Sequence, residues 1–410
     1  MAFVFYLLYV TSYFLHFGER IPALGSIRID LILVILTAVC IVLLNDKDRS
    51  TKIDKTGIIL LGILLYIVIT LPLVQWPGSV INSGFENYFK VIIFYFFTVL
   101  IVTNQQKLKI FLFVFAACQM YRVLEPLYLH VATDYWGDAT SMGHGEMMDR
   151  LAGSPYDVIN PNGLAFVAVT SIVFIFYLSR TLPSIWRVTG HALLPLMVYA
   201  LVLTGSRSGM VALAGVAVGI IMTSRRKIIF ISVLILLSIF AFQRLDDMQQ
   251  DRYLSIYRGD VRGASTAQGR IEGIYRDFEV AMNRPLFGHG LGTSLEASYN
   301  IGSTALRSHN LVMEVWQEIG LVGLVIYFYY IIISIRNYLT ALRRMNQPGI
   351  DELRNMARGV GAWLILLLIF SIFSYGLSSY SWYLFGGLSV VFMRLLTDNA
   401  ESERNGVAPA

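Results

Sequence analysis

Apolar runs of membrane-spanning length recur along the whole chain, and they constrain its fold more than any other feature. They cover residues 2–17, 29–44, 56–74, 88–103, 110–128, 162–179, 189–204, 208–222, 228–242, 310–335, 359–375 and 380–397. A helix needs about 20 apolar residues to cross a bilayer, so twelve spans would use about 240 positions. Of the 410 residues, 56% are hydrophobic and only 14% are charged, far fewer than in a soluble domain. The sequence therefore predicts an all-α polytopic membrane protein with about 12 transmembrane helices, and it excludes a soluble enzyme or a disordered chain.

The distribution of basic residues orients these spans. If the N-terminus is cytoplasmic, the predicted inside segments carry eighteen basic residues, at 45–55, 104–109, 180–188, 223–227, 336–358 and 394–410. The short outside segments carry four, namely Arg20, Arg28, Arg150 and Arg207. Cytoplasmic loops are typically enriched in this way. We therefore expect both termini in the cytoplasm, the first run as a span rather than a cleaved leader, and a cytoplasmic tail at 398–410.

The longest segment between spans, 243–307, separates nine predicted spans at 1–242 from three at 308–397. It holds eight arginines, no lysine and eight acidic residues, so a non-specific basic surface is the wrong description. Arginine instead offers a planar fork that binds phosphate in bidentate fashion. Ser265 and Gln268 match a capping box, and an apolar stripe at helical spacing follows until Pro285. We expect an amphipathic helix that lies on the membrane surface or covers a cavity.

Polar residues at the predicted outer ends of spans are the candidates for chemistry. Arg207 lies in a glycine- and serine-rich turn at 204–209. Arg270 lies near the start of the loop helix, where the helix dipole favours a bound phosphate. His309 precedes the tenth span, and an imidazole at the water boundary can accept a proton near neutral pH. These three residues predict a site for a phosphorylated substrate with one general base.

Charged residues inside predicted spans form a second set of candidates. Glu314 lies just within the tenth span, where a carboxylate is costly unless it lines a polar cavity. Arg122 and Glu125 form an i,i+3 pair within the fifth span. Motifs for nucleotide or metal binding are lacking, so we expect no cofactor and no metal site. The net charge of +5 does not indicate nucleic acid as a partner, because the basic residues lie where they set topology.

The order of the motifs resembles the O-antigen ligase and O-antigen polymerase superfamily of bacterial envelope glycosyltransferases. The matching pieces are 160–165, 204–209, 268–270, 284–292, 309–310 and 318–324. The resemblance implies a GT-C-like fold in the bacterial inner membrane, with a large periplasmic loop between helices 9 and 10 and a periplasmic active site. It also implies a glycan donor on undecaprenyl pyrophosphate and a transfer that is inverting and metal-independent.

The resemblance assigns roles to individual residues. Arg207 and Arg270 would hold the pyrophosphate as catalytic residues, and His309 would take the proton from the acceptor hydroxyl. We expect further contacts with substrate from Arg284, Asn310, Glu314, Arg122 and Asn162.

Three functions remain open at this point. The first is a ligase that uses lipid A–core as acceptor, and the second is a repeat-unit polymerase of O-antigen or exopolysaccharide. The third is a transporter or flippase of anionic or lipid-linked solutes. Many transporters are built from repeated halves, whereas this chain has one long outside segment and no evident repeat. We therefore favour the enzyme, and within it the ligase, with the lipid-linked glycan donor, the acceptor and the bilayer as partners.

Overall fold

A computed structural model of the chain describes residues 1–43, 53–143, 146–223, 228, 232, 235–236, 239–240, 242–243, 245–255, 265–300, 308–345, 350–374 and 376–404. The chain forms two compact units, which are described one at a time. The first comprises Met1–Leu44, Leu108–Gly269 and Asp351–Phe370. The second comprises Asn45–Lys107, Arg270–Ile350 and Ser371–Ala410. Each unit is therefore assembled from segments far apart in the sequence.

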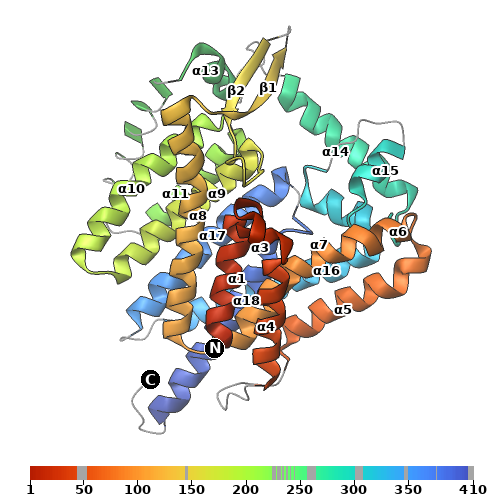
Figure 1. Cartoon of the computed structure of the whole chain (residues 1–410), viewed down its shortest axis with the longest axis vertical. Helices are drawn as coiled ribbons and strands as arrows, with labels where there is room; N and C mark the ends of the chain where they lie inside the picture. Colours follow the sequence, from red (N-terminus) through yellow and green to blue (C-terminus); the bar gives the residue numbers. More distant parts are fainter. Residues whose placement is uncertain are drawn as a thin grey trace. The chain divides into compact units, whose positions relative to one another are not determined.

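The first unit is mainly a bundle of helices, in which α1 packs along α4 and α9 packs along α10 (Figure 1). Trp363 of α17 is fully buried in it, and its indole N–H donates to Thr170 Oγ1 at 3.2 Å. The elements of this unit are α1 (Ala2–Leu15), α2 (Phe17–Arg20), α3 (Pro22–Ser26), α4 (Ile29–Leu43), α8 (Gln105–Thr133, of which Leu108 onward belongs here), β1 (Gly137–Gly143), β2 (Glu146–Leu151), α9 (Pro161–Leu178), η3 (Ser179–Thr181), α10 (Ser184–Leu203), α11 (Arg207–Thr223), α13 (Asp247–Leu254) and α17 (Asp351–Phe373, of which the part up to Phe370 belongs here).

A short antiparallel hairpin of β1 and β2 lies between α8 and α9. Its register pairs Asp138 with Arg150. Met148 and Arg150 are buried while Met147 and Asp149 are exposed, which is the two-residue period of a strand. The chain is otherwise helical as predicted, and this hairpin is the one departure within the described ranges. It places Arg150 on the buried side.

The second unit is built around α16, against which α5 and α18 pack, and α7 packs on α18 in turn. Its core contains the mutually contacting rings of Tyr88, Tyr327, Tyr330 and Tyr383, all fully buried. The elements are α5 (Lys55–Thr70), η1 (Leu71–Leu73), α6 (Pro77–Ser79), η2 (Val80–Gly84), α7 (Phe85–Ile101), α14 (Ser265–Asn283, of which Arg270 onward belongs here), α15 (Ser294–Asn300), α16 (Leu311–Arg344) and α18 (Tyr380–Arg404).

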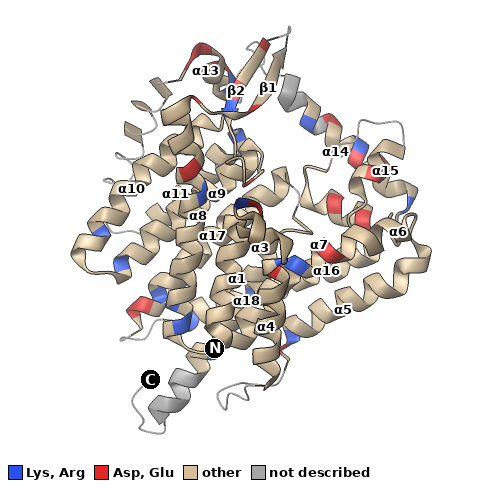
Figure 2. Cartoon of the chain, in the orientation of Figure 1, with Lys and Arg blue, Asp and Glu red and all other residues tan. Residues whose placement is uncertain are grey.

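Seven helical segments of the described chain are long and apolar enough to cross a membrane, so the protein is a multi-pass membrane protein. They are Lys55–Leu73, Pro77–Ile101, Gln105–Thr133, Pro161–Thr181, Ser184–Leu203, Leu311–Arg344 and Asp351–Phe373. Charged residues are sparse along such helices, as α5 and α9 illustrate (Figure 2).

The remaining predicted spans have different outcomes. α1, α4 and most of α11 are apolar but shorter helices. α18 contains the last predicted run and continues to Arg404, into the segment predicted as a tail. The ninth predicted run, 228–242, lies largely outside the described residues. The count of twelve spans, the position of the long loop and the division at 242, 307 and 397 therefore stay predictions.

Local sequence explains where the helices nearest the site begin. Asn160 precedes Pro161, and its Oδ1 accepts from Gly163 N at 2.8 Å to cap α9. Asn310 caps α16 in the same way, because its Oδ1 accepts from the backbone N–H groups of Val312 and Met313. Such caps satisfy donors that have no partner within the helix. Both asparagines thus fix the start of a helix beside a candidate residue.

Candidate active site

The turn between α10 and α11 carries Arg207 as the first residue of α11 and is held by two other arginines of the first unit. Arg150 Nε donates to Thr204 O at 2.8 Å, and Arg252 Nε donates to Gly205 O at 2.8 Å. The two guanidinium groups are deeply buried, with 5% and 4% of each residue exposed. These contacts fix the backbone immediately before Arg207.

The arginines act at the end of a helix where positive charge is favoured. The last carbonyl groups of α10 lack intrahelical partners and form the negative end of the helix dipole. The Tyr253 hydroxyl donates at 2.8 Å to Val202 O, a third carbonyl group of this helix end. Arg207 itself is half-buried, and its Nη1 donates to Ser255 Oγ at 2.8 Å. Hydrogen bonds from Arg150, Arg252 and Tyr253 therefore fix the turn, while Arg207 stays partly exposed.

Asn162 is a further brace of this turn. Its Oδ1 accepts from Arg150 Nη2 at 3.2 Å and from Ser206 Oγ at 2.8 Å. Ser206 Oγ in turn accepts from Gly209 N at 3.2 Å, inside the first turn of α11. The structure thus links the motif at 160–165 to the motif at 204–209, which the sequence presents 44 residues apart. A contact of Asn162 with substrate stays a prediction.

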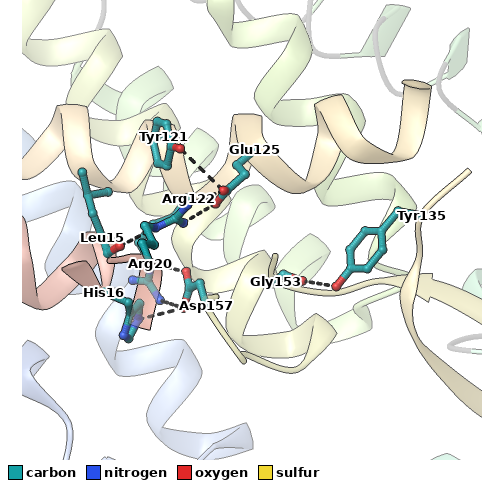
Figure 3. A network of polar contacts seen from close by, with 9 residues as sticks. All are labelled: Leu15, His16, Arg20, Tyr121, Arg122, Glu125, Tyr135, Gly153 and Asp157. Atoms are coloured by element: carbon teal, nitrogen blue, oxygen red, sulfur yellow. Dashed lines mark hydrogen bonds and ion pairs between the residues drawn. The ribbon is translucent and has the colours of Figure 1, made fainter. Parts of the chain in front are cut away.

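Arg122 belongs to a separate polar network of the first unit (Figure 3). Its Nε donates to Asp157 Oδ2 at 2.6 Å and its Nη2 to Asp157 Oδ1 at 3.1 Å. Glu125 instead binds Arg20 through both carboxylate oxygens at 2.5 Å. The expected i,i+3 pairing of Arg122 with Glu125 is therefore wrong, because each finds a better partner from a distant segment.

Asp157 is the centre of that network. His16 Nε2 lies 3.2 Å from Asp157 Oδ1, and the carboxylate side chain is only 1% exposed. Burial alone would raise the pKa of Asp157, but the hydrogen bond from His16 and the charge and hydrogen bonds of Arg122 lower it from 3.8 to about 2. The network joins α1 and α8 to the loop that leads into Asn160, so it supports the motif at 160–165. It gives Arg122 a structural partner, and the predicted contact of Arg122 with substrate stays a prediction.

The second unit carries Arg270 on α14, an amphipathic helix as the sequence predicts. Asp277 lies seven residues after Arg270, on the same helix face; it is 2% exposed, and Val280 and Ala281 beside it are fully buried. The predicted apolar stripe lies on the outside: Ile274, Tyr275, Phe278 and Met282 are 39%, 70%, 42% and 49% exposed. Arg270 and Asp277 therefore lie on the face of α14 that is turned toward the unit. The apolar side chains lie on the opposite, exposed face, where they can contact membrane lipid.

His309 lies between α15 and α16 and is exposed, next to the cap residue Asn310. Arg270 and Arg276 of α14 act on it electrostatically. Partial desolvation, followed by the positive charge of Arg270, lowers the pKa of His309 below 6.5, against the opposing charge of Asp277. Partial desolvation also lowers the pKa of Arg270 from its usual value. Both residues thus belong to the second unit, and the lowered pKa of His309 favours its neutral form.

Other residues predicted to bind substrate have structural contacts in this unit. Glu314 is 5% exposed, and its Oε2 accepts from Gly376 N at 2.6 Å and Leu377 N at 2.9 Å. Asn310 caps α16, and its Nδ2 donates to Ile372 O at 3.2 Å. These contacts make Glu314 a weaker candidate base than His309, because it already binds two backbone N–H groups.

Arg284 remains open to a ligand. It is exposed, and its Nη1 donates to Leu73 O at 3.0 Å. It borders a groove of about 200 Å³ at the end of the span Lys55–Leu73, lined by Leu73, Arg284, Pro285, Leu286, Phe287 and Gly288. This position suits a charged group attached to an apolar chain.

The glycine-rich motif at 284–292 pairs with the motif at 318–324 through the backbone. His289 N donates to Gln317 O at 2.8 Å, and Leu321 N donates to Pro285 O at 2.8 Å. α16 is interrupted at Gly320, whose φ of 69° places it in the left-handed region. A Cβ atom on Gly320 would lie 2.2 Å from Leu286 O, so only glycine fits there. The two motifs therefore form one structural feature of the second unit.

His289 is buried at the end of this feature and was not among the expected site residues. Its Nε2 lies 2.8 Å from Val280 O and its Nδ1 2.7 Å from the Gln75 side-chain amide. Burial lowers the pKa of His289, which keeps the ring neutral. A neutral ring donates from Nε2 to Val280 and accepts at Nδ1 once Gln75 turns its amide nitrogen toward it. With both nitrogens occupied, His289 holds the motif in place and is not available as a base.

The eight predicted site residues divide between the two units. The first unit holds Arg207, Arg122 and Asn162, and the second holds Arg270, Arg284, His309, Asn310 and Glu314. Sequence reasoning missed Arg150 and Arg252, which it treated as topology and loop charges.

A family model described as O-antigen ligase matches residues 192–328. The match includes the turn of Arg207, the helix of Arg270 and the entry to α16 at His309, and it excludes Arg122 and Asn162. No curated protein matches the chain significantly. Through the segment 192–328, about a third of the chain, the protein is similar to the O-antigen ligase family.

Proposed function

We propose that the protein is a bacterial inner-membrane glycosyltransferase that moves a glycan from undecaprenyl pyrophosphate to an acceptor hydroxyl on the periplasmic side. The observation that carries the proposal is that Arg270 and His309 belong to one unit, where the charge of Arg270 acts on His309 just before the membrane helix α16. A guanidinium suits the phosphate of a donor held in the bilayer, and a neutral imidazole suits the proton of an acceptor arriving from water.

The reaction needs one base and a stabilised leaving group. The acceptor O–H bond breaks as its oxygen bonds to the anomeric carbon, and the proton passes to a ring nitrogen of His309. The bond between that carbon and the pyrophosphate oxygen breaks, and its electron pair leaves with the pyrophosphate. Arg207 and Arg270 stabilise the charge that develops on this leaving group. Attack from the opposite face inverts the anomeric configuration, and no metal ion is needed in this scheme.

Arg207 has a scaffold suited to this task. Its turn is fixed by the buried guanidinium groups of Arg150 and Arg252. A phosphate-binding group that is held before substrate arrives loses less conformational freedom on binding. Arg284, beside its apolar groove, would contact the donor where the pyrophosphate meets the lipid chain.

We favour lipid A–core as the acceptor, which makes the protein a ligase, and a repeat-unit polymerase is the alternative. Glycan analysis of a deletion strain separates the two. Lipid-linked polymer that accumulates without attachment indicates a ligase, whereas single attached repeat units indicate a polymerase. Unchanged transfer activity together with donor retained on the cytoplasmic face would indicate a flippase and would contradict the proposal.

The base is tested by transfer kinetics with purified protein, donor and acceptor. His309→Gln keeps some hydrogen bonding but accepts no proton at useful pH, so turnover should fall by about 10²–10⁴-fold. For the wild type, the rate should fall as pH drops through the lowered pKa of His309, because the ring becomes protonated. His191→Gln, in α10 of the first unit, is the matched control and should retain its activity. A normal rate for His309→Gln would remove His309 as the base.

A further inference from the structure

We infer that Tyr121 and Tyr156, called the tyrosine pair below, form a binding site for a sugar of the donor glycan, with the guanidinium group of Arg20 between the two rings. The sugar is a pyranose that lies further along the glycan than the sugar bonded to the pyrophosphate. The inference rests on the proposed function, in which Arg207 of the first unit holds that pyrophosphate. It gives the first unit a second contact with the same donor.

The tyrosine pair is arranged around one arginine. Arg20 Cζ lies 5.3 Å from the centre of the Tyr121 ring and 5.1 Å from the centre of the Tyr156 ring. Its Nη1 and Nη2 donate to the Glu125 carboxylate at 2.5 Å, and its Nε donates to Leu15 O at 2.5 Å (Figure 3). The guanidinium covers one face of each ring, while 42% of Tyr121 and 46% of Tyr156 stay exposed. The first unit thus presents two aromatic surfaces beside a charged pair.

A buried ion pair fixes the backbone that carries these rings. Tyr121 directly precedes Arg122 on α8, and Tyr156 directly precedes Asp157 in the loop before α9. Arg122 Nε donates to Asp157 Oδ2 at 2.6 Å, and the two side chains are only 9% and 1% exposed. Both rings are therefore positioned before any ligand arrives. Because a tyrosine held in this way loses little conformational freedom on binding, the exposed rings suit recognition of a ligand.

A pyranose ring matches the chemistry of this surface. The C–H groups on one face of a pyranose contact the electron-rich face of an aromatic ring favourably, and its hydroxyl groups need hydrogen-bond partners. Nη1 and Nη2 of Arg20 each carry a further N–H group, and the Glu125 carboxylate can accept; both side chains are partly exposed. A lipid chain would have no use for the charged pair, and the carboxylate disfavours a phosphate. These groups therefore favour a sugar.

The tyrosine pair lies within reach of the turn that carries Arg207. Tyr156 is six residues before Asn162, whose Oδ1 accepts from Ser206 Oγ at 2.8 Å within that turn. Six residues span at most about 20 Å, a distance that a short oligosaccharide covers. Arg20 is also among the residues that the charge bias assigns to the outside, where the glycan of the proposed donor lies. A donor held at Arg207 would therefore place a sugar beyond the first against the tyrosine pair.

The test compares two donors in the transfer assay with full-length protein in nanodiscs. One donor is polyprenyl pyrophosphate with the complete glycan, and the other carries only the first sugar. Tyr121→Ala and Tyr156→Ala should each raise KM for the complete donor about three- to tenfold and leave kcat nearly unchanged. KM for the single-sugar donor should not change, because this donor does not reach the tyrosine pair. Tyr156→Phe keeps the ring and should keep the KM of the wild type within about twofold.

A direct binding measurement separates this inference from the proposed function. The probe is the oligosaccharide released from the donor by mild acid, without pyrophosphate or lipid, and saturation-transfer NMR follows its titration onto the protein in nanodiscs. The wild type should bind it, and Tyr156→Ala should weaken binding about three- to tenfold. If the wild type binds the oligosaccharide through Tyr156 but transfers neither donor, the proposed glycosyltransferase is wrong and the sugar site stands.

Tyr329→Ala is the matched control, because Tyr329 is 43% exposed and Lys55 Nζ lies 5.8 Å from the centre of its ring in the second unit. This variant should keep the KM of the wild type for both donors. Size-exclusion profiles and thermal unfolding show whether each variant is folded. Unchanged KM and unchanged oligosaccharide binding in folded Tyr121→Ala and Tyr156→Ala would overturn the inference and leave the rings as anchors at the membrane boundary. An equal rise in KM for both donors would also overturn it, since the contact would then not involve a distal sugar.

Discussion

Replacing Asp157 with asparagine should destabilise the first unit by roughly 2–3 kcal/mol. The pKa of Asp157 is lowered from 3.8 to about 2, and each pKa unit corresponds to about 1.4 kcal/mol of preference for the ionised form. The side chain is 1% exposed, so solvent screens this interaction little. Asparagine has the shape of the protonated acid and removes only the charge. For a unit of this size the expected fall in Tm is roughly 5–10 °C.

The pH dependence of this loss has a definite sign. A carboxylate with a lowered pKa in the folded state stabilises the protein above its unfolded pKa. The stability that Asp157 contributes should therefore be complete above about pH 5 and decline between about pH 4 and pH 2. Thermal unfolding in detergent, at one scan rate, should show wild type and Asp157→Asn converging as the pH falls through this range.

Two further variants make the test specific. Arg122→Met leaves the buried carboxylate without its cation and should cost about 3–5 kcal/mol, and the double variant should cost less than the sum. Asp351→Asn is the matched control, because Asp351 pairs with Arg354 at the surface, where 79% of the Asp351 side chain is exposed. Its effect should stay below about 1 kcal/mol. A difference between wild type and Asp157→Asn that is absent at pH 7, or does not narrow at low pH, would refute the reasoning.

The remaining predictions concern phosphate binding and orientation. Arg207→Lys and Arg270→Lys keep the charge but lose the planar fork, so each should lower kcat/KM by about tenfold or more in the purified transfer assay; wild-type kinetics at normal expression would disprove bidentate binding. In a cysteine-free background, Asn300→Cys should react with a membrane-impermeant thiol reagent in cells with a permeabilised outer membrane, whereas Ser184→Cys should not, both positions being exposed. The reverse labelling pattern would overturn the orientation.

Much of the helical layout could be predicted because its signals are local. Apart from 228–242, which is only partly described, each apolar run coincides with a helix, and the starts of α9 and α16 follow from asparagines that bind N–H groups two or three residues ahead. The hairpin was not predicted, because its residues are polar and small, and only packing shows which of them are buried. Capping and hydropathy act within a few residues, whereas burial of a mixed segment depends on the whole unit.

The candidate site was predictable to a lesser degree. The order of motifs selected Arg270 and His309, which both belong to the second unit, and their roles stay predictions. The partner of Arg122 could not be read from the sequence, because Asp157 lies 35 residues away and a local rule favoured Glu125. Arg150 was also misjudged, because the rule that orients membrane spans counts every arginine in a loop as a charge at the membrane surface. Its burial at a helix end is a tertiary property.

The pairing of the motifs at 284–292 and 318–324 has a consequence for how such chains are recognised. Most of the hydrogen bonds between them join backbone N–H and C=O groups, with the Glu318 carboxylate accepting from Gly292 N as the exception, so much of the pairing does not depend on side-chain identity, whereas Gly320 cannot be replaced. A sequence signature that consists largely of the glycines in these two motifs indicates the path of the backbone. A distant homologue could therefore keep the signature after losing transfer chemistry, and under the proposed mechanism Arg207, Arg270 and His309 are the residues that would distinguish a working enzyme.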